Sequence, residues 1–549
     1  AAPAVPPAGA VPTFEQLRPN LAPPAPSPDA VPDLPPPREL GKPLDDITVD
    51  VTGYTVDASA PAELRAALAE LTAPYTGPRR SFEDLMGAVA AVGRYLQRDM
   101  GLYLGYAYLP EQRLEDGQVR IAVLEGRLDE VLLRWRDDIP VDRAVVEAHL
   151  AQLKPGDVLR VIDVERVVFL LNDLRGLTAR FEVRQGRKPG TATLVVSPQP
   201  DQRVGGKIEF DANGSRFSGL YRMGATAYVA SPLGRGDGVV LSAQTTDTQG
   251  LSFLLGGYTL PIGSQGLKAG VSMSRVDYRL NEEVPLGLTG RATAASIYAL
   301  HPVVRSRNLN LFLQVSQEVR EFLDRKADLG SVADATKRTR ETRLGMAGDF
   351  RDNALLGGVS TYELAAVFSR VDYLRNGPSA AMRDPRQRTR VTFGFSRLNN
   401  LISNRMLLFF SLQGQKARSN LDTTEQFGIG GPTRVRSYAP GEGTGDEGLV
   451  TSVELRLLPP ESWLGRHARE TVLMAFYDWG RVRYKHDPSA QVNGFVNRGT
   501  FSGYGMGAIW ERPRTLTARL TLGWPVQGEV QNDTVKRSPR LYATLTHPF

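Results

Sequence analysis

The sequence predicts a transmembrane β-barrel of about sixteen antiparallel strands, preceded by two small α+β domains. Three observations support this fold class. Helical periodicity ends near residue 200 and gives way to segments of about ten residues in which apolar and polar side chains alternate, as in tilted membrane strands. The connections between these segments alternate between short and long. Before residue 200, one order of strands and helices occurs twice.

Residues 1–43 are dominated by proline and alanine and have too few large apolar side chains to form a core, so we expect a partly extended leader. One short pattern stands out within it. Thr13 begins a segment with capping-box spacing, and apolar side chains follow at helical intervals up to Leu21. Two interpretations of residues 13–21 stay open: a short helix that plugs or docks, and a disordered tail with a chance pattern.

Residues 44–126 and 127–200 each predict a domain with the element order β-α-α-β-β. Ser81 is a good N-cap, and an apolar stripe at helical spacing follows it. The elements expected in the first domain are strands at 47–51, 102–109 and 118–123 and helices at 63–71 and 81–98. Those expected in the second are strands at 131–135, 177–184 and 191–196 and helices at 144–153 and 162–174. The repeated order predicts two copies of one module.

The pattern of residues 201–549 predicts the barrel, because each segment carries its apolar side chains on one face. A soluble β-sandwich would also alternate, but segment length and the connections favour a barrel. The expected short connections are Ser231–Asp237 and Arg512–Arg514, and the expected long ones are Val319–Arg338, Asp372–Arg388 and Ala417–Asp446. The last strand ends on the aromatic residue Phe549, and pairing it with the first strand would remove both sheet edges.

A glycine-rich loop, residues 417–446, interrupts the alternating segments and contains Arg434 and Arg436. A loop of this length in a compact domain usually has a function, and a buried arginine requires a partner. We therefore expect the loop to fold into the barrel, with Arg436 bound to an acidic side chain of the wall. Asp478 and Gly480 lie on the face of their segment that alternation assigns to the lumen. Nucleotide binding is not expected, since no GK[ST] motif or helix follows the glycines.

Composition excludes several classes of function. The chain of 549 residues has no cysteine, so disulfides, thiolate metal sites and a cysteine nucleophile are excluded. Its five histidines are scattered, and we expect no metal site and no cofactor. The net charge of +6 is spread along the chain and does not indicate a nucleic-acid partner. No residue set resembles a nucleophile, a base and an oxyanion site, so an enzyme is not expected. The chain starts at Ala1, as expected of a mature protein after signal-peptide removal.

Several motifs, in this order and spacing, resemble the TpsB family, the FhaC- and ShlB-like outer-membrane transporters of two-partner secretion in the BamA superfamily. The segment from Ala107 to Gln112, with Glu125-Gly126 after it, is similar to the AYLPxQ and IxVxEG motifs of a POTRA domain. Leu170–Gly176 and 188–191 resemble the LLNDLPG and PGT motifs of the second domain. Ser231–Asp237 is similar to the NPLGxGD turn of the barrel.

The resemblance gives the glycine-rich loop an identity. Val435, Arg436, Ser437 and Tyr438 are similar to the VRGY/F tip that dips into the barrel in this superfamily, with Ser437 in place of the glycine. The segment with Asp478 and Gly480 resembles the FxDxG motif that supplies the partner of the arginine. A strand with Leu102, Leu104, Tyr106 and Tyr108 is expected to accept an extended peptide by β-augmentation; the alternative is a strand fully satisfied inside its own sheet. For Phe549 the resemblance implies an assembly signal, and the alternative is a residue of the aromatic girdle.

The function implied by the resemblance is a pore in the Gram-negative outer membrane, with its POTRA domains in the periplasm. It would export one large secreted TpsA-like polypeptide, an adhesin, cytolysin or toxin, in extended form and without ATP. Further partners would be outer-membrane lipid and, during biogenesis, the barrel-assembly machinery, and we expect a monomer. The alternative is a BamA-type assembly or insertion factor, which two modules and a proline-rich leader disfavour. A soluble all-β binding protein is a third possibility.

Overall fold

The structure is a computed structural model, and it describes residues 48–188, 190–280, 288–328, 331–376, 386–402, 405–489, 491, 494–530 and 538–549. The leader, with the pattern at residues 13–21, lies outside the described residues. The chain forms two compact units, one with the two α+β modules and one with the barrel. None of the helices in the described ranges has the length and hydropathy needed to cross a membrane.

The first module is built on a three-stranded sheet of order β2-β5-β4, in which β2 runs parallel to β5. β1 corresponds to the strand predicted at 47–51, but its antiparallel partner β3 was not predicted; β3 has no apolar alternation, and backbone pairing with β1 holds it. The elements are β1 (Thr48–Val51), β2 (Gly53–Val56), α2 (Ala62–Thr72), η2 (Ala73–Tyr75), β3 (Gly77–Ser81), α3 (Phe82–Arg94), η3 (Tyr95–Asp99), β4 (Tyr106–Tyr108) and β5 (Gln118–Leu124). Ser81 caps α3 in a capping box with Asp84, as its position predicted.

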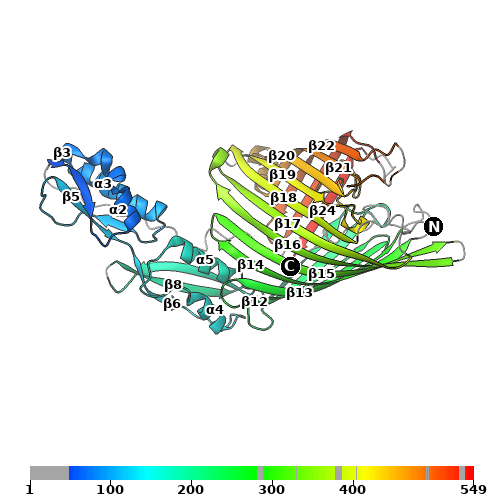
Figure 1. Cartoon of the computed structure of the whole chain (residues 1–549), viewed down its shortest axis with the longest axis horizontal. Helices are drawn as coiled ribbons and strands as arrows, with labels where there is room; N and C mark the ends of the chain where they lie inside the picture. The colour runs from blue at the N-terminus through cyan, green and yellow to red at the C-terminus, as the bar shows by residue number, and fades with distance from the viewer. Residues whose placement is uncertain are drawn as a thin grey trace. The chain divides into compact units, whose positions relative to one another are not determined.

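The second module repeats the same sheet topology, with order β6-β8-β7 and β6 parallel to β8. Its elements are β6 (Arg127–Leu133), α4 (Arg143–Leu150), α5 (Val161–Asn172), β7 (Leu177–Gln185) and β8 (Thr191–Pro200). The observed order agrees with the predicted β-α-α-β-β order, and the apolar faces of α4 and α5 pack on the sheet in one core. In Figure 1 the two modules are the blue and cyan parts of the ribbon.

Two polar residues of the module motifs are structural clamps. The Gln112 side chain accepts the N–H of Arg120 at 2.7 Å and donates to its carbonyl at 2.8 Å, which joins the loop after β4 to β5. The Asn172 side chain accepts the N–H of Ala179 at 2.7 Å and donates to the Ala179 carbonyl at 3.1 Å, which joins the end of α5 to β7. Each side-chain amide satisfies both main-chain groups of one strand residue.

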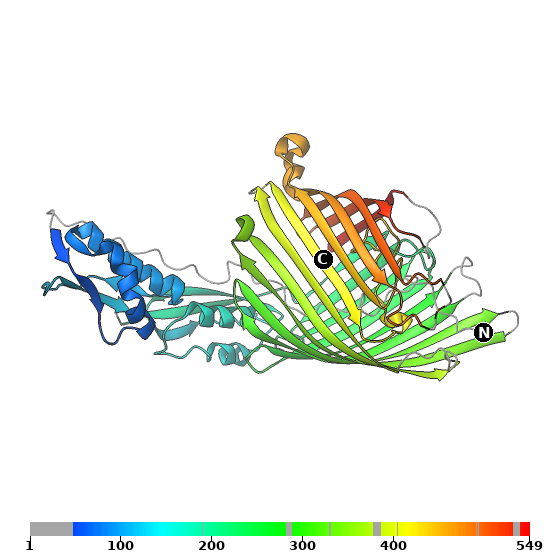
Figure 2. The ribbon, with the colours of Figure 1, turned by 45° about the horizontal axis from the view of Figure 1, so that its top comes forward.

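The barrel is closed and antiparallel, with sixteen strands, β9 to β24, in the described chain, and β9 pairs with both β10 and β24. Figures 1 and 2 show these strands, from green to red, around one lumen. The strands are β9 (Val204–Asp211), β10 (Arg222–Ala230), β11 (Gly238–Thr246), β12 (Leu251–Ile262), β13 (Leu267–Arg279), β14 (Thr289–Arg305), β15 (Leu309–Asp328), β16 (Ser331–Asp352), β17 (Gly358–Arg375), β18 (Gln387–Ile402), β19 (Met406–Ala417), β20 (Glu447–Leu457), β21 (Thr471–Arg483), β22 (Arg498–Arg512), β23 (Leu516–Gln527) and β24 (Arg540–Pro548).

Among the described residues, short helical segments occupy three connections of the barrel. They are η4 (Ala354–Leu356), η6 (Thr423–Glu425), and α6 with η7 (Glu461–Leu464 and Gly465–Glu470). Figure 2 shows α6 in orange beyond the ends of β20 and β21. Because the strands alternate in direction, the connections after β9, β11, β13, β15, β17, β19, β21 and β23 lie at the end of the barrel opposite to the one at which the chain enters.

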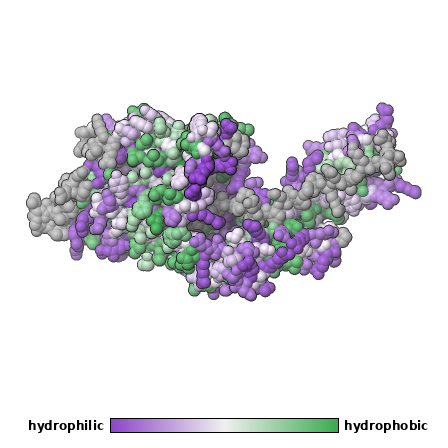
Figure 3. Space-filling model, turned by 180° about the vertical axis from the view of Figure 1, so that it is seen from behind, coloured by the Kyte–Doolittle hydropathy of each residue, from purple (hydrophilic) through white to green (hydrophobic). Residues whose placement is uncertain are grey.

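Apolar side chains cover the outside of the barrel, and the alternation predicted for β21 is observed. Met474, Phe476 and Asp478 are buried, whereas Tyr477 on the other face is 47% exposed. Other strands behave in the same way; exposed apolar residues include Leu241, Leu254, Met273, Ile297, Leu313, Leu344, Leu364 and Met506. Figure 3 shows apolar residues, in green, gathered over the barrel strands. An apolar outer surface of this kind matches hydrocarbon.

Two expectations about the connections had different outcomes. Ser231–Asp237 forms the expected short connection: the buried Asp237 carboxylate accepts N–H groups of Leu233 and Arg235 and the Tyr258 hydroxyl. The expected long loop Val319–Arg338 was wrong, because β15 and β16 continue as a paired hairpin through this region. In the sequence of this region, polar residues occur at both odd and even positions, so alternation does not identify it as a strand pair.

The last residue closes the barrel through its main chain. Phe549 accepts the N–H of Gly206 at 3.0 Å and donates to the Gly206 carbonyl at 2.9 Å, which extends the ladder between β24 and β9. The site has no space for a side chain at Gly206: a Cβ there would lie 2.2 Å from the Thr226 carbonyl oxygen and 2.6 Å from the Phe549 ring. The closure therefore depends on a glycine opposite the carboxy-terminus.

We expect Gly206→Ala to weaken barrel closure by about 1–3 kcal/mol, because the added methyl group forces β9 away from its neighbours. The measurement is the temperature at which the folded form is lost in gels of unheated samples. Gly224→Ala is the matched control, since the nearest atom to its Cβ would be at an ordinary 3.4 Å. Equal midpoints for the two variants would contradict the expectation.

Candidate functional site

The candidate site is the loop between β19 and β20, which lies inside the barrel. Its tip is fully packed: Val435, Arg436, Ser437 and Tyr438 are each at most 4% exposed. The loop forms its own small core with the wall, made of Phe427, Ile429, Val435, Tyr438, Val450, Val482 and Phe501. Thus the predicted inward fold of the loop is present in the structure, and apolar packing as well as charge holds it.

Arg436 binds Asp478 of β21 through two parallel hydrogen bonds. Its Nε donates to Oδ2 at 2.8 Å and its Nη2 donates to Oδ1 at 2.6 Å. The main-chain N–H of Arg436 donates to the same Oδ2 at 3.0 Å. Both side chains are almost completely buried. A guanidinium and a carboxylate in this bidentate geometry form one of the stronger pairs in proteins.

Three further wall groups complete the coordination of Arg436, and the sequence analysis missed them. Glu454 accepts from Nη1 at 2.6 Å, and the Ser452 hydroxyl accepts from Nη2 at 2.8 Å. The guanidinium carbon also lies 3.5 Å from the centre of the Phe476 ring. The available signal was the alternation of β20, which places Ser452 and Glu454 on the luminal face. One carboxylate is enough to neutralise a guanidinium, so the sequence pattern does not indicate a second partner.

Glycines in the barrel wall allow the tip of the loop to approach the wall closely. A Cβ at Gly480 would lie 2.6 Å from Ile429, and one at Gly523 would lie 2.8 Å from the Arg436 carbonyl oxygen. A Cβ at Gly503 would lie 2.1 Å from the hydroxyl oxygen of Ser437. Gly480, predicted as part of the luminal motif, therefore acts by allowing close approach. The other two glycines were missed, because only the folded structure brings β22 and β23 to the loop.

Ser437 occupies the glycine position of the motif without a left-handed backbone. Its hydroxyl is buried and has no hydrogen-bond partner among the described residues. The space for this side chain is provided by Gly503. Serine in place of glycine thus makes the backbone less flexible and buries a hydroxyl without a hydrogen bond. The unsatisfied hydroxyl costs about 1–3 kcal/mol.

Tyr438 connects the tip to the last two strands. Its hydroxyl donates to the Gln527 carbonyl at 2.7 Å, and its own carbonyl accepts the Tyr542 hydroxyl at 2.6 Å. Its ring meets the Phe501 ring edge-on, with centroids 5.1 Å apart. Arg434, by contrast, stays within the loop, where it contacts the Gly428 carbonyl and the Phe427 ring. The two arginines of the loop therefore have different roles.

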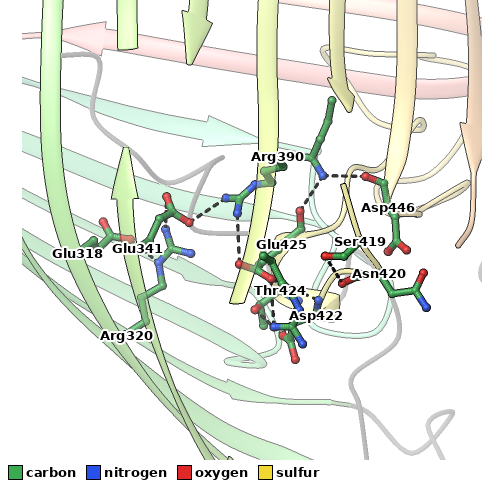
Figure 4. A network of polar contacts seen from close by, with 12 residues as sticks. Glu318, Arg320, Glu341, Arg390, Ser419, Asn420, Asp422, Thr424, Glu425 and Asp446 are labelled. Carbon is green, nitrogen blue, oxygen red and sulfur yellow. Dashed lines mark hydrogen bonds and ion pairs between the residues drawn. The ribbon is translucent and has the colours of Figure 1, made fainter. Parts of the chain in front are cut away.

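A second set of ion pairs holds the base of the loop against β16 and β18, on the other side of β19 from the strands that hold the tip (Figure 4). Glu425 lies between Arg388 and Arg390 of β18, at 3.4 and 3.2 Å. Asp422 accepts from Lys337 at 2.7 Å and from the Tyr373 hydroxyl at 3.1 Å. Burial opposes ionisation of Asp422, but Lys337 and two hydrogen bonds from Thr424 outweigh it and hold the pKa of Asp422 below its usual value.

The predicted peptide-binding strand of the first module is only partly present. β4 begins at Tyr106, so Leu102 and Leu104 were wrongly assigned to it. Leu102 is buried, and its N–H donates to the Leu96 carbonyl at 2.9 Å. Capping of the preceding helix and a bridge to Arg160 of the second module take precedence over strand formation there. Tyr106 and Tyr108 remain on an edge strand, with their rings stacked 6.0 Å apart.

Comparison with known proteins agrees with this architecture. Residues 190–508 match the family model of the haemolysin secretion/activation proteins ShlB/FhaC/HecB, and residues 49–126 match the POTRA domain of ShlB type. The chain belongs to the ShlB/FhaC/HecB family. Among curated relatives, the heme/hemopexin transporter protein HuxB of Haemophilus influenzae is 23% identical over 476 residues, which cover 85% of this chain and 81% of HuxB. The outer membrane transporter CdiB of Dickeya dadantii is 22% identical over 481 residues, with the same two shares.

Solved structures show the same fold. CdiB from Escherichia coli matches with a TM-score of 0.67 at 20% identity and covers 94% of each chain. BamA from Haemophilus ducreyi, lacking its POTRA domains 1–3, matches with a TM-score of 0.52 at 13% identity and covers 92% of this chain and 100% of that chain. The prediction of a TpsB-type, outer-membrane transporter of two-partner secretion is confirmed by the family match, and the BamA-type alternative has less support.

The described residues contain no group of three or more His, Cys, Asp or Glu side chains placed to hold a metal ion. The contacts that hold the loop tip are ion pairs, hydrogen bonds and apolar packing. The loop lies inside the barrel, and Arg436 attaches its tip to the wall.

We expect Gly503→Ala to displace the tip, because the new methyl group collides with Ser437, and Ser437→Gly to restore docking in the double variant. Docking is measured as protection of a cysteine from maleimide after Val435→Cys, the single thiol in a chain without cysteine. A destabilisation of about 1.4 kcal/mol would raise the labelling rate about tenfold. Additive effects of the two substitutions would show that the pair does not interact.

Proposed function

We propose that the protein exports one large TpsA-like polypeptide in extended form, and that the Arg436 contacts keep the pore closed until this partner arrives. The single observation that carries the proposal is the bidentate pair of Arg436 with Asp478 inside the barrel. The similarity to HuxB, a heme/hemopexin transporter protein, and to CdiB, an outer membrane transporter, supports transport across this membrane.

The free energy of the Arg436–Asp478 pair suits a contact that holds the loop in the lumen. Removal of one partner from a buried ion pair costs about 3–5 kcal/mol, because the other charge stays buried and unpaired. Release of the whole loop costs less, since water can enter and hydrate both charges. A partner that supplies new contacts can therefore shift the loop, whereas thermal fluctuation opens the pore rarely.

Recognition of the partner would begin at the first module. β4 is the edge of its sheet, and the stacked rings of Tyr106 and Tyr108 offer a flat apolar surface beside it. An extended secretion signal could add a strand there, with main-chain hydrogen bonds for affinity and the rings for selectivity. Transport would then draw its free energy from folding of the partner outside the cell, without ATP.

Two further parts of the proposal concern biogenesis and assembly. The Phe549 side chain is 53% exposed although its main chain is paired, so the ring is accessible to the barrel-assembly machinery. The closed barrel contains the complete luminal site within one chain, which suits a monomer in outer-membrane lipid.

We expect Arg436→Ala to abolish or sharply lower export of the partner, while the protein still reaches the outer membrane and folds. The measurement is the amount of partner in the culture medium, together with heat-modifiability of the barrel. Arg434→Ala is the matched control, because this arginine lies two positions away and contacts the Gly428 carbonyl and the Phe427 ring of the loop itself. Normal export by Arg436→Ala, or equal loss in both variants, would refute the role of the pair.

We expect Tyr106→Ala with Tyr108→Ala to weaken binding of the partner's secretion signal by at least about tenfold, since aromatic contacts dominate such interfaces. Binding of the purified signal to the full-length protein in detergent is measured by titration. Thr178→Ala with Arg180→Ala provides the control on β7, the edge strand of the second module. Loss of binding in the control alone would assign recognition to β7 instead.

A further inference from the structure

The pair of arginines on β18 has more hydrogen-bonding capacity than the loop uses. Arg388 and Arg390 are two residues apart on the luminal face, and both are almost completely buried. Glu425 contacts one nitrogen of each, at 3.4 and 3.2 Å. The Nε and Nη2 atoms of Arg388 and the Nε atom of Arg390 are buried without a hydrogen-bond partner among the described residues. The site is therefore built for a carboxylate and is incompletely filled by Glu425.

The neighbouring charges show which of the two arginines depends on Glu425 for its carboxylate partner. Arg390 also binds Glu341 of β16 at 2.8 Å, and Glu341 in turn contacts Arg320 of β15 at 3.4 Å, so these groups stay paired within the wall (Figure 4). For Arg388, the ion pair with Glu425 is the carboxylate contact that the described residues provide. Departure of the loop would leave Arg388 facing the lumen without a carboxylate from those residues.

The two anchors of the loop differ in geometry. At the tip, four side-chain hydrogen bonds of Arg436 measure 2.6 to 2.8 Å. At the base, the contacts of Glu425 with the two arginines are longer and each uses one nitrogen. Short bidentate pairs are specific and strong, whereas long single contacts are readily replaced. Within the base, the contact of Glu425 with the two arginines is thus the place where a competing anion can enter.

We propose that Arg388 and Arg390 form a carboxylate-binding site on the transport path, occupied at rest by Glu425 and, during export, by aspartate and glutamate side chains of the passing polypeptide. This inference rests on the proposed export function. Replacement of one carboxylate by another keeps both guanidinium groups paired throughout, which lowers the cost of moving the loop away. The site would favour acidic over basic segments of the exported chain.

The electrostatic part can be tested without a partner, in the full-length protein in liposomes. A cysteine at Thr392→Cys lies on the same face of β18, near Arg343, whose Nη2 is 3.3 Å from the Thr392 hydroxyl oxygen. Its reaction rates are measured with 2-sulfonatoethyl methanethiosulfonate, which is anionic, and with 2-(trimethylammonium)ethyl methanethiosulfonate, which is cationic. The chain has no other thiol.

We expect Glu425→Ala to raise the ratio of anionic to cationic rates about tenfold, because it vacates the arginine pair. Addition of Arg388→Gln and Arg390→Gln should return the ratio to its value in the parent. A ratio that does not respond to Glu425→Ala, or that stays high without the two arginines, would overturn the assignment of the site.

The transport part is tested by export of the partner. Arg388→Gln with Arg390→Gln should lower the export rate, with the Val435→Cys tip still protected, and Arg388→Lys with Arg390→Lys should retain most of it. Parental export by the glutamine variant would overturn the role of the site and leave the proposed function intact. Absence of partner export by the parent protein would instead refute the proposed function.

Discussion

A buried guanidinium must have partners, and this constraint organises the inside of the barrel. Arg436 is 3% exposed and meets Asp478, Glu454 and Ser452 on two adjacent strands. The contacts require the backbone of the tip to lie directly on the wall, which explains the absence of side chains at Gly480 and Gly523. The loop is therefore held at one depth and in one orientation in the lumen, and its apolar side chains pack accordingly.

The loop combines two kinds of attachment. At the tip, charge-assisted hydrogen bonds, the Tyr438 contacts and an apolar cluster act together, so they are lost together. At the base, Asp422 and Glu425 are held by cations of β16 and β18, and their contacts can be exchanged one at a time. A plug with only the first kind would be difficult to release, and one with only the second would leak. The combination suits the proposed closure of the pore by the loop and its release during export.

Periodicity and local motifs predicted much of this arrangement. The alternation in β21 was sufficient to place Asp478 in the lumen, and the need of Arg436 for a partner then connected the two. Contacts that depend on distant strands could not be predicted. Gly503 is adjacent to Ser437 only after the barrel closes. Glu454, on the strand next to that of Asp478, accepts a hydrogen bond from Arg436 only when the loop lies in the lumen. Leu102 was misassigned because capping of the preceding helix and a bridge to the second module compete with the sheet. β3 was missed because its side chains carry no apolar pattern.

The unequal height of the wall has a consequence for the outside of the cell. β15 and β16 contain 20 and 22 residues, whereas β9 to β11 contain 8 or 9, and a membrane strand needs only about ten. At about 3.3 Å per residue the hairpin continues tens of ångströms past the shorter strands. It lies at the end of the barrel opposite to the chain entry. The wall is thus much taller on one side of the barrel at this end. An emerging polypeptide would be shielded by the hairpin on that side and exposed to water on the other.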